Sequence, residues 1–163
     1  MIIGNGNIAS VLPDREDLIF FASGVSNSQE ERESEYQREM DLLMKQDKYA
    51  HIVYFSSLGV LDGDSRYYTH KRQMEAAVKR YFDTYTIVRI GNITWGNNPH
   101  TLINAMRNIV EKGEKLEIRD VYRYLVDKDE FLYWINLIPD WSCEISIPGR
   151  RMKVKDVVKE YVL

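Results

Sequence analysis

Residues 51–57 read HIVYFSS, residues 67–81 read YYTHKRQMEAAVKRY and residues 85–90 read YTIVRI. The first and third stretches are apolar runs of strand length, whereas the middle stretch repeats its apolar residues at helical spacing. A strand, a helix and a second strand in this order predict a β-α-β unit, whose two strands lie parallel in one sheet. This unit decides the fold class, because it requires a sheet with helices packed on it.

The alternation of strand and helix patterns extends on both sides of this unit. Toward the amino terminus, apolar runs at residues 1–3 and 18–22 precede a helical pattern over residues 29–48. Toward the carboxyl terminus the pattern predicts a helix over 102–110 that Gly113 ends, short strands at 115–118 and 124–126, a helix over 129–137, a strand at 144–147 and a helix over 154–162. The sequence therefore predicts an α/β protein with a mainly parallel sheet flanked by helices.

The size and the charge of the chain exclude several classes of function. With 163 residues, of which 44% are hydrophobic and 29% charged, it has the composition of an ordinary globular protein, and we expect one domain over residues 1–163. A formal net charge of -3 offers no basic face for nucleic acid or for an anionic membrane. The lone Cys143 cannot form an internal disulfide, and Met1–Gly4 does not begin a signal peptide, so we expect a cytoplasmic protein.

The first apolar run opens into the loop Gly4–Ala9, which reads GNGNIA. Its two glycines permit a tight turn and let backbone N–H groups approach a pyrophosphate, as in dinucleotide-binding loops that lead from a strand into a helix. The position of the loop supports this interpretation, because open α/β sheets bind ligands at the carboxyl ends of their strands. A plain strand-to-helix turn without a ligand is the alternative.

Three residues of the β-α-β unit suggest acid–base chemistry. Tyr67 and Lys71 are one helical turn apart, so the ammonium can lie beside the phenol and favour its ionised form. Tyr67 then becomes a candidate general acid or base near neutral pH, and Ser57, at the end of the preceding strand, could hydrogen-bond the reacting oxygen better than Ser56. The alternative is an exposed tyrosine and lysine beside a turn serine. A second Tyr-x-x-x-Lys match, at 124–128, neither opens a helix nor follows a serine-ended strand, so we interpret it as structural.

Five segments together resemble one family. Residues 55–60 (FSSLGV), 67–71 (YYTHK) and 88–96 (VRIGNITWG) are similar to the strand-end serine, the Tyr-x-x-x-Lys helix and the following strand and loop of the extended short-chain dehydrogenase/reductases, the nucleotide-sugar epimerases and dehydratases. Residues 17–23 resemble the fourth strand of that family, and residues 123–130 resemble a segment that precedes a substrate-side helix. The resemblance implies a reduced Rossmann-like fold, NAD or NADP as cofactor, and a sugar or nucleotide-sugar as substrate.

The resemblance also implies roles for individual residues. It implies a catalytic set of Ser57, Tyr67 and Lys71. Ser57, Asn92 and Arg123 would contact the substrate, with the Arg123 guanidinium at a diphosphate. The implied cofactor contacts are Gly4, Asn5, Gly6, Asn7, Ile8, Ala22, Ser23, Tyr67, Lys71 and Ile90.

For the whole chain, the resemblance implies a nucleotide-binding core over residues 1–100 and a small substrate-side subregion over residues 101–163. The predicted helices Gln29–Lys48 and Tyr67–Tyr81 match the pair through which the family commonly dimerises, so we expect a homodimer. Gly91 stands where many members of the family have proline, and we expect this departure to loosen the loop that it begins.

One departure from the family leads to a second hypothesis. From Ala9 the chain passes almost directly to residues 18–22, so the family's second and third strands, which recognise the adenosine, have no counterpart. We therefore weigh an NAD(P)-dependent oxidoreductase, epimerase or dehydratase with Tyr67 as general acid or base against a non-catalytic descendant that binds a nucleotide or a partner protein. No metal is expected, because metal-ligand spacing is missing from the three histidines, His51, His70 and His100.

Overall fold

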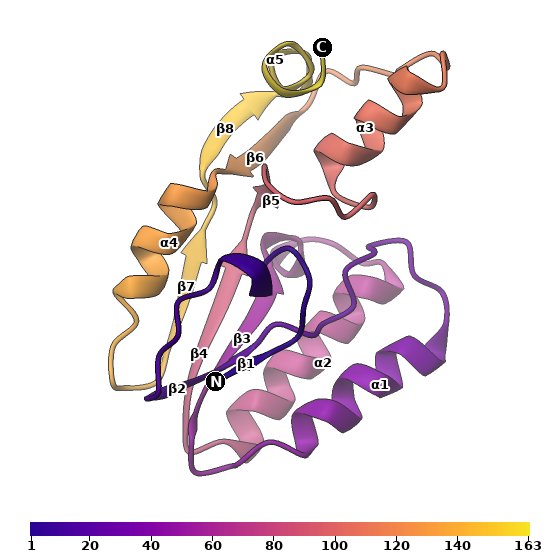
Figure 1. The fold of residues 1–163 in the computed structure, drawn as a ribbon. Helices are drawn as coiled ribbons and strands as arrows, with labels where there is room; N and C mark the ends of the chain where they lie inside the picture. Colours follow the sequence, from indigo (N-terminus) through magenta and orange to yellow (C-terminus); the bar gives the residue numbers. More distant parts are fainter.

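Five strands form a sheet in which every neighbouring pair runs parallel (Figure 1). The computed structural model describes residues 1–163, and the order of the strands across this sheet is β1-β2-β3-β4-β7. The strands are β1 (Ile2–Ile3), β2 (Leu18–Phe21), β3 (His51–Ser57), β4 (Thr84–Ile90) and β7 (Cys143–Ile147). The predicted parallel sheet flanked by helices is confirmed.

Two helices, α1 (Glu33–Met44) and α2 (Arg66–Tyr81), cover one face of this sheet (Figure 1). Successive side chains of a strand point to opposite faces, so every second residue of each strand packs under these helices. The resulting core consists of Ile19, Phe21, Leu43, Ile52, Tyr54, Met74, Val78, Phe82 and Ile87. Helix α1 is shorter than the predicted Gln29–Lys48, because residues 29–32 form a turn and an extended lead-in and the helix ends at Met44. Helix α2 begins one residue before the predicted Tyr67 and ends at Tyr81 as predicted.

The other face of the sheet is covered by α4 (Lys128–Asn136) and by η1 (Ala9–Val11), a single 3-10 turn. The alternate strand residues, such as Phe20, Val53 and Phe55, pack against Phe131 and Ile135 of α4 in a second core. Leu12 joins this core directly after η1. The sheet is therefore buried on both faces, as the continuously apolar strands indicated.

A smaller sheet lies beyond the carboxyl ends of the main strands, in the upper part of Figure 1. It contains β5 (Asn92–Ile93), β6 (Tyr122–Val126) and β8 (Arg150–Lys153), with β6 parallel to β5 and antiparallel to β8. Helix α3 (Leu102–Glu111) and α5 (Val154–Val157), which continues as the π turn η3 (Val158–Val162), pack on it through Ile103, Leu125 and Val157. After β6 and α4 the chain returns to the main sheet, where β7 pairs with β4.

Local sequence patterns predicted most of the helices and strands in the carboxyl-terminal part of the chain, but not all of them. The strand predicted at residues 115–118 is wrong: the segment has no regular structure and is mostly exposed, because no strand lies beside it. Strand β8 reads RRMK and carries no apolar pattern, so its formation depends on the pairing with β6. Gly113 ends α3 as predicted, with a φ of 71° that suits a helix terminus.

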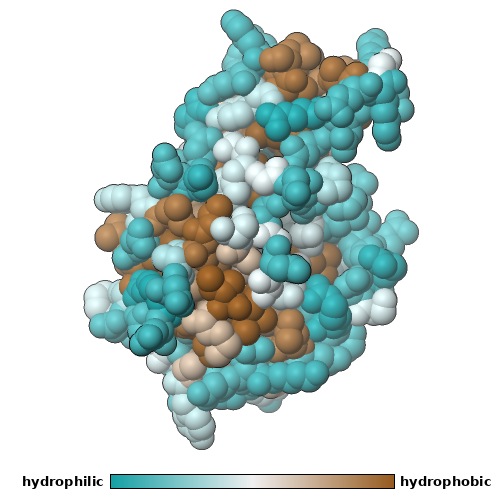
Figure 2. Space-filling view, in the orientation of Figure 1, coloured by the Kyte–Doolittle hydropathy of each residue, from teal (hydrophilic) through white to brown (hydrophobic).

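Strand β1 is the edge of the main sheet and has only two residues, which pair with β2. The segment that joins β1 to β2 contains η1 and no longer helix. Figure 2 shows one face of the molecule, where hydrophilic side chains cover most of the surface and hydrophobic ones gather around the region of η1. No helix in the structure combines the length and the apolarity that crossing a bilayer requires.

Candidate functional site

A cavity of about 490 Å³ opens at the carboxyl ends of β1 to β4. Its volume lies within the range usual for small-molecule and cofactor sites. The predicted site residues that line it are Asn5, Gly6, Asn7, Ile8, Ala22, Ser23, Ser57, Tyr67, Lys71, Ile90 and Asn92. Segments that are far apart in the sequence thus meet around one space, and Gly4 and Arg123 are the two predicted residues that do not line it.

The glycine loop turns sharply because it passes close to β2. Gly4 has a φ of 120°, and a Cβ added there would lie 2.3 Å from the carbonyl oxygen of Ala22. A Cβ at Gly6 would meet no atom within 4 Å, so the loop is open toward the cavity at that position. The helix that follows is a single turn, Ala9–Val11, and therefore has no helix dipole of the size that a dinucleotide loop commonly uses.

Asn7 connects the glycine loop to the loop after β5. Its carbonyl oxygen accepts a hydrogen bond of 2.9 Å from Trp95 Nε1, and its side-chain amide donates to the Trp95 carbonyl at 3.4 Å. Its Oδ1 accepts from the Asn97 N–H at 3.3 Å, and Gly96, with a φ of 90°, leaves the room that this side chain occupies. No local pattern predicted that Asn7 and Trp95 connect these two loops.

The two serines at the end of β3 have different partners. Ser56 is buried, and its hydroxyl donates to Glu75 Oε2 at 2.5 Å, inside an ion pair between Glu75 and Arg89. Ser57 Oγ accepts from the Gly59 N–H at 3.2 Å and caps the turn η2 (Leu58–Leu61), which leaves its hydroxyl hydrogen available. Of the two serines, Ser57 is therefore the one with a free hydroxyl hydrogen, because that of Ser56 is donated to Glu75.

Tyr67 lies in the first turn of α2, where Ser65 caps the helix by accepting from the Tyr68 N–H at 3.3 Å. Lys71 Nζ is 5.5 Å from the centre of the Tyr67 ring, and the Tyr68 ring meets it edge to face. Burial raises the pKa of the Tyr67 phenol above its ordinary value, the Lys71 ammonium acts in the opposite direction, and the Glu39 carboxylate adds to the rise. The expected effect of Lys71 is present, but it does not outweigh burial.

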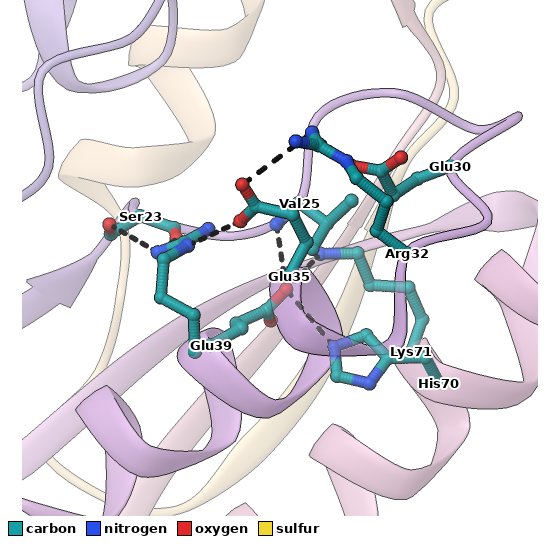
Figure 3. A network of polar contacts seen from close by, with 9 residues as sticks. Ser23, Val25, Glu30, Arg32, Glu35, Glu39, His70 and Lys71 are labelled. Carbon is teal, nitrogen blue, oxygen red and sulfur yellow. Dashed lines mark hydrogen bonds and ion pairs between the residues drawn. The ribbon is translucent and has the colours of Figure 1, made fainter.

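Lys71 is also paired with other groups. Its ammonium, buried in α2, lies 3.4 Å from Glu39 Oε1 and donates to the Tyr54 hydroxyl at 3.2 Å. Figure 3 shows Lys71, His70 and the Val25 backbone converging on the Glu39 carboxylate. The sequence pattern of α1 did not single out Glu39, because only the packing of α1 on α2 brings its carboxylate to Lys71.

Arg38 lines the cavity, and sequence reasoning missed it. Its Nη1 donates to the carbonyl and the hydroxyl of Ser23 at 3.0 and 3.3 Å, and its Nε donates to Glu35 at 2.8 Å. The guanidinium therefore holds the loop after β2 against α1. It is also the partly exposed cation of the cavity, since the Lys71 ammonium is buried.

Several other predicted residues have specific positions. Arg123 lies on β6 and donates to the Tyr122 carbonyl at 3.1 Å, away from the cavity. Asn92 begins β5 and donates to the Tyr124 carbonyl at 3.0 Å. At Gly91 a Cβ would lie 2.5 Å from the Pro148 carbonyl oxygen, and its N–H donates to the Ile147 carbonyl; the expected loosening of the loop stays a prediction. The second Tyr-x-x-x-Lys match spans the end of β6 and the start of α4, as expected for a structural match.

No family model matches the sequence, and no curated protein matches it. Its fold is similar to those of several solved structures. A UDP-N-acetylglucosamine 4-epimerase from Methanobrevibacter ruminantium M1, in complex with UDP-N-acetylmuramic acid, has a TM-score of 0.64 at 16% identity, covering 90% of this chain and 62% of that one. A dTDP-4-dehydrorhamnose reductase from Bacillus anthracis, in complex with NADP, has a TM-score of 0.62 at 17% identity, covering 88% and 61%. The Bordetella bronchiseptica enzyme WbmG, in complex with NAD, has a TM-score of 0.59 at 14% identity, covering 88% and 54%.

These similarities confirm the Rossmann-like α/β fold, and at such low identity they show the fold alone. These three structures include an epimerase and a reductase, and their chains are longer than this one. Across the similar structures this chain covers between 43% and 62% of their length.

Proposed function

We propose that this chain binds NAD or NADP in the cavity and acts as an oxidoreductase, epimerase or dehydratase on a sugar or nucleotide-sugar. The observation that carries the proposal is the meeting of the glycine loop, Ser57, Tyr67 and Lys71 around one cavity at the carboxyl ends of parallel strands. The similar structures that contain NAD or NADP, or a UDP-linked sugar, support it.

The residues around the cavity fit the nicotinamide, ribose and pyrophosphate part of such a cofactor. The open space at Gly6 gives a pyrophosphate access to the backbone of the glycine loop. Ala22, Ser23 and Ile90 would form the walls on either side. An ammonium has three donors, and the two contacts of Lys71 leave one for a ribose hydroxyl.

The adenosine end has less support. Strand β1 is the edge of the sheet, so no neighbouring strand offers a carboxylate to the adenine ribose. Arg123, to which the family resemblance gave a diphosphate role, does not line the cavity and donates to the Tyr122 carbonyl, so the proposed site does not include it. We therefore expect a cofactor to bind weakly and with little discrimination between NAD and NADP.

When bound, NAD(P) supplies a hydride donor or acceptor. Ser57 would donate its free hydroxyl hydrogen to the reacting oxygen of the sugar, and the phenol of Tyr67 would give or take the proton at that oxygen. Asn92 and the polar loop at residues 98–101 would orient the remaining hydroxyls of the substrate.

Thermal unfolding with and without NAD and NADP tests the proposal. A ligand at a hundred times its dissociation constant should add about 2.7 kcal/mol to the stability. Gly6→Val would fill the open space in the loop, and we expect this variant to lose the ligand-induced stabilisation while its unliganded melting stays close to that of the wild type. If neither cofactor stabilises the wild type at millimolar concentration, the proposal fails.

A specific observation favours the second candidate, a non-catalytic protein that binds a nucleotide or a partner. Lys71 is neutralised by Glu39, and burial raises the pKa of Tyr67, so the phenol of the unliganded protein is a poor base at neutral pH. The test is ligand-induced stabilisation combined with turnover. Stabilisation by NAD(P) without any conversion of UDP- or dTDP-linked sugars would favour the binding protein.

A further inference from the structure

The carboxylate of Glu39 is fully buried and accepts hydrogen bonds from three segments of the protein. Oε1 accepts from the Val25 N–H at 2.7 Å, and Oε2 accepts from the Tyr54 hydroxyl at 2.6 Å. His70 Nε2 lies 3.2 Å from Oε1 and must donate, because an ionised carboxylate only accepts. Together with Lys71, these donors satisfy a carboxylate that would otherwise be costly to bury.

This arrangement puts a charge-balanced pair beside the cavity. The Glu39 carboxylate and the Lys71 ammonium compensate each other, and no other carboxylate lies within salt-bridge distance of Lys71. The remaining ionisable groups that face the pair are His70 from α2, Tyr54 from β3 and Arg38 from α1. Gly24 closes the space above it, since a Cβ there would lie 2.7 Å from Lys71 Nζ.

The pair affects Tyr67, which lies one helical turn before Lys71 in α2 and lines the cavity. Lys71 attracts a negative charge on the phenol and Glu39 repels it, so the two effects oppose each other. We propose that Glu39 is a positioning residue for this site: it holds the Lys71 ammonium in a buried pair and so counters the stabilisation that this ammonium, 5.5 Å from the Tyr67 ring, gives to the ionised phenol. The significance of Tyr67 as a reacting group rests on the proposed function, but the proposed effect of Glu39 on the phenol does not.

The experiment is a titration of Tyr67 in the full chain without any ligand. Protein labelled with ¹³C at tyrosine Cζ gives one resonance per tyrosine, and Tyr67→Phe identifies the resonance of Tyr67. In Glu39→Gln the ammonium of Lys71 loses its counter-charge, and we expect the titration midpoint of Tyr67 to fall by about one pH unit or more. Glu75→Gln is the matched control, because Glu75 is also buried in an ion pair, with Arg89, and should leave Tyr67 unchanged.

Two further variants separate this role from a purely structural one. Lys71→Gln leaves the Glu39 charge alone, so the Tyr67 midpoint should rise, and this result tests the proposal even if Glu39→Gln does not fold. The double variant Glu39→Gln/Lys71→Gln removes both charges and should titrate as the wild type does. An unmoved Tyr67 in the folded single variants, or equal shifts in Glu39→Gln and Glu75→Gln, would overturn the proposal. None of these titrations requires a cofactor, so their results would still test the role of Glu39 if the protein did not bind NAD(P).

Discussion

Glu39 should make the stability of this protein depend on pH in the acid range. Burial by itself would raise the pKa of its carboxyl, but Lys71 and the hydrogen bonds from His70, Tyr54 and Val25 outweigh burial and lower the pKa from 4.5 to about 2. A pKa that folding lowers gives stability that is complete above 4.5 and is lost as the pH falls toward 2. At about 1.36 kcal/mol per pH unit the contribution is roughly 3 kcal/mol at neutral pH, and about 2 kcal/mol of it should be gone at pH 3.

Urea unfolding of the wild type and of Glu39→Gln, followed by tryptophan fluorescence between pH 7 and pH 3, measures this contribution. At pH 7 the variant should be less stable by roughly 3 to 5 kcal/mol, because it leaves the Lys71 ammonium buried and unpaired. That difference should shrink by about 2 kcal/mol at pH 3, where the wild type has lost most of its advantage. In the wild type Lys71 does not titrate in this range, because burial lowers its pKa but Glu39 more than offsets this and raises it. In Glu39→Gln that contribution is lost, so the double variant Glu39→Gln/Lys71→Gln is the comparison in which the unpaired ammonium plays no part.

The control for this experiment is Glu117→Gln, which removes a carboxylate that is 78% exposed and should change stability little at any pH. A stability difference between the wild type and Glu39→Gln that stays constant from pH 7 to pH 3 would refute the reasoning. It would mean that the carboxylate is not held in its ionised form by the contacts described.

The remaining predictions concern the cavity and the assembly. Tyr67→Phe should fold normally and lower turnover on a sugar substrate at least about 100-fold, and an unchanged rate in a steady-state assay would exclude Tyr67 as the acid or base. Calorimetric titration should give NAD and NADP affinities within about tenfold of each other; a preference beyond a hundredfold would reveal a selector that we have not recognised. Gly4→Ala should cost more than about 2 kcal/mol in chemical unfolding, because its Cβ meets the Ala22 carbonyl, whereas Gly6→Ala should cost far less, and equal costs would contradict the loop geometry. Light scattering should give about twice 19.2 kDa for a homodimer formed through α1 and α2, and the mass of one chain over a concentration series would disprove it.

Much of the site could be predicted from the sequence, because local patterns place its residues on one face of a helix or at the end of a strand. Tyr67 and Lys71 share a helix face by their spacing, and Ser57 ends a strand that the apolar run defines. Since the carboxyl ends of parallel strands meet at one edge of a sheet, the glycine loop and these residues were expected to share a cavity, and they do. Arg123 was assigned on resemblance alone, and nothing local fixed where its strand would lie.

What the sequence determined by itself is the α/β class, the order of the main strands along the chain and the helices between them, because periodicity in hydrophobic residues is a local property. The tertiary structure alone decided which charged groups meet. Glu39 lies on a helix whose pattern marks it as polar, and it becomes buried only because α1 packs against α2 and the loop at Val25 closes over it. Strand β8 likewise exists only because β6 lies beside it. Pairings of this kind join residues that are distant in sequence, and their energies depend on burial and on charge separation, which no local pattern encodes.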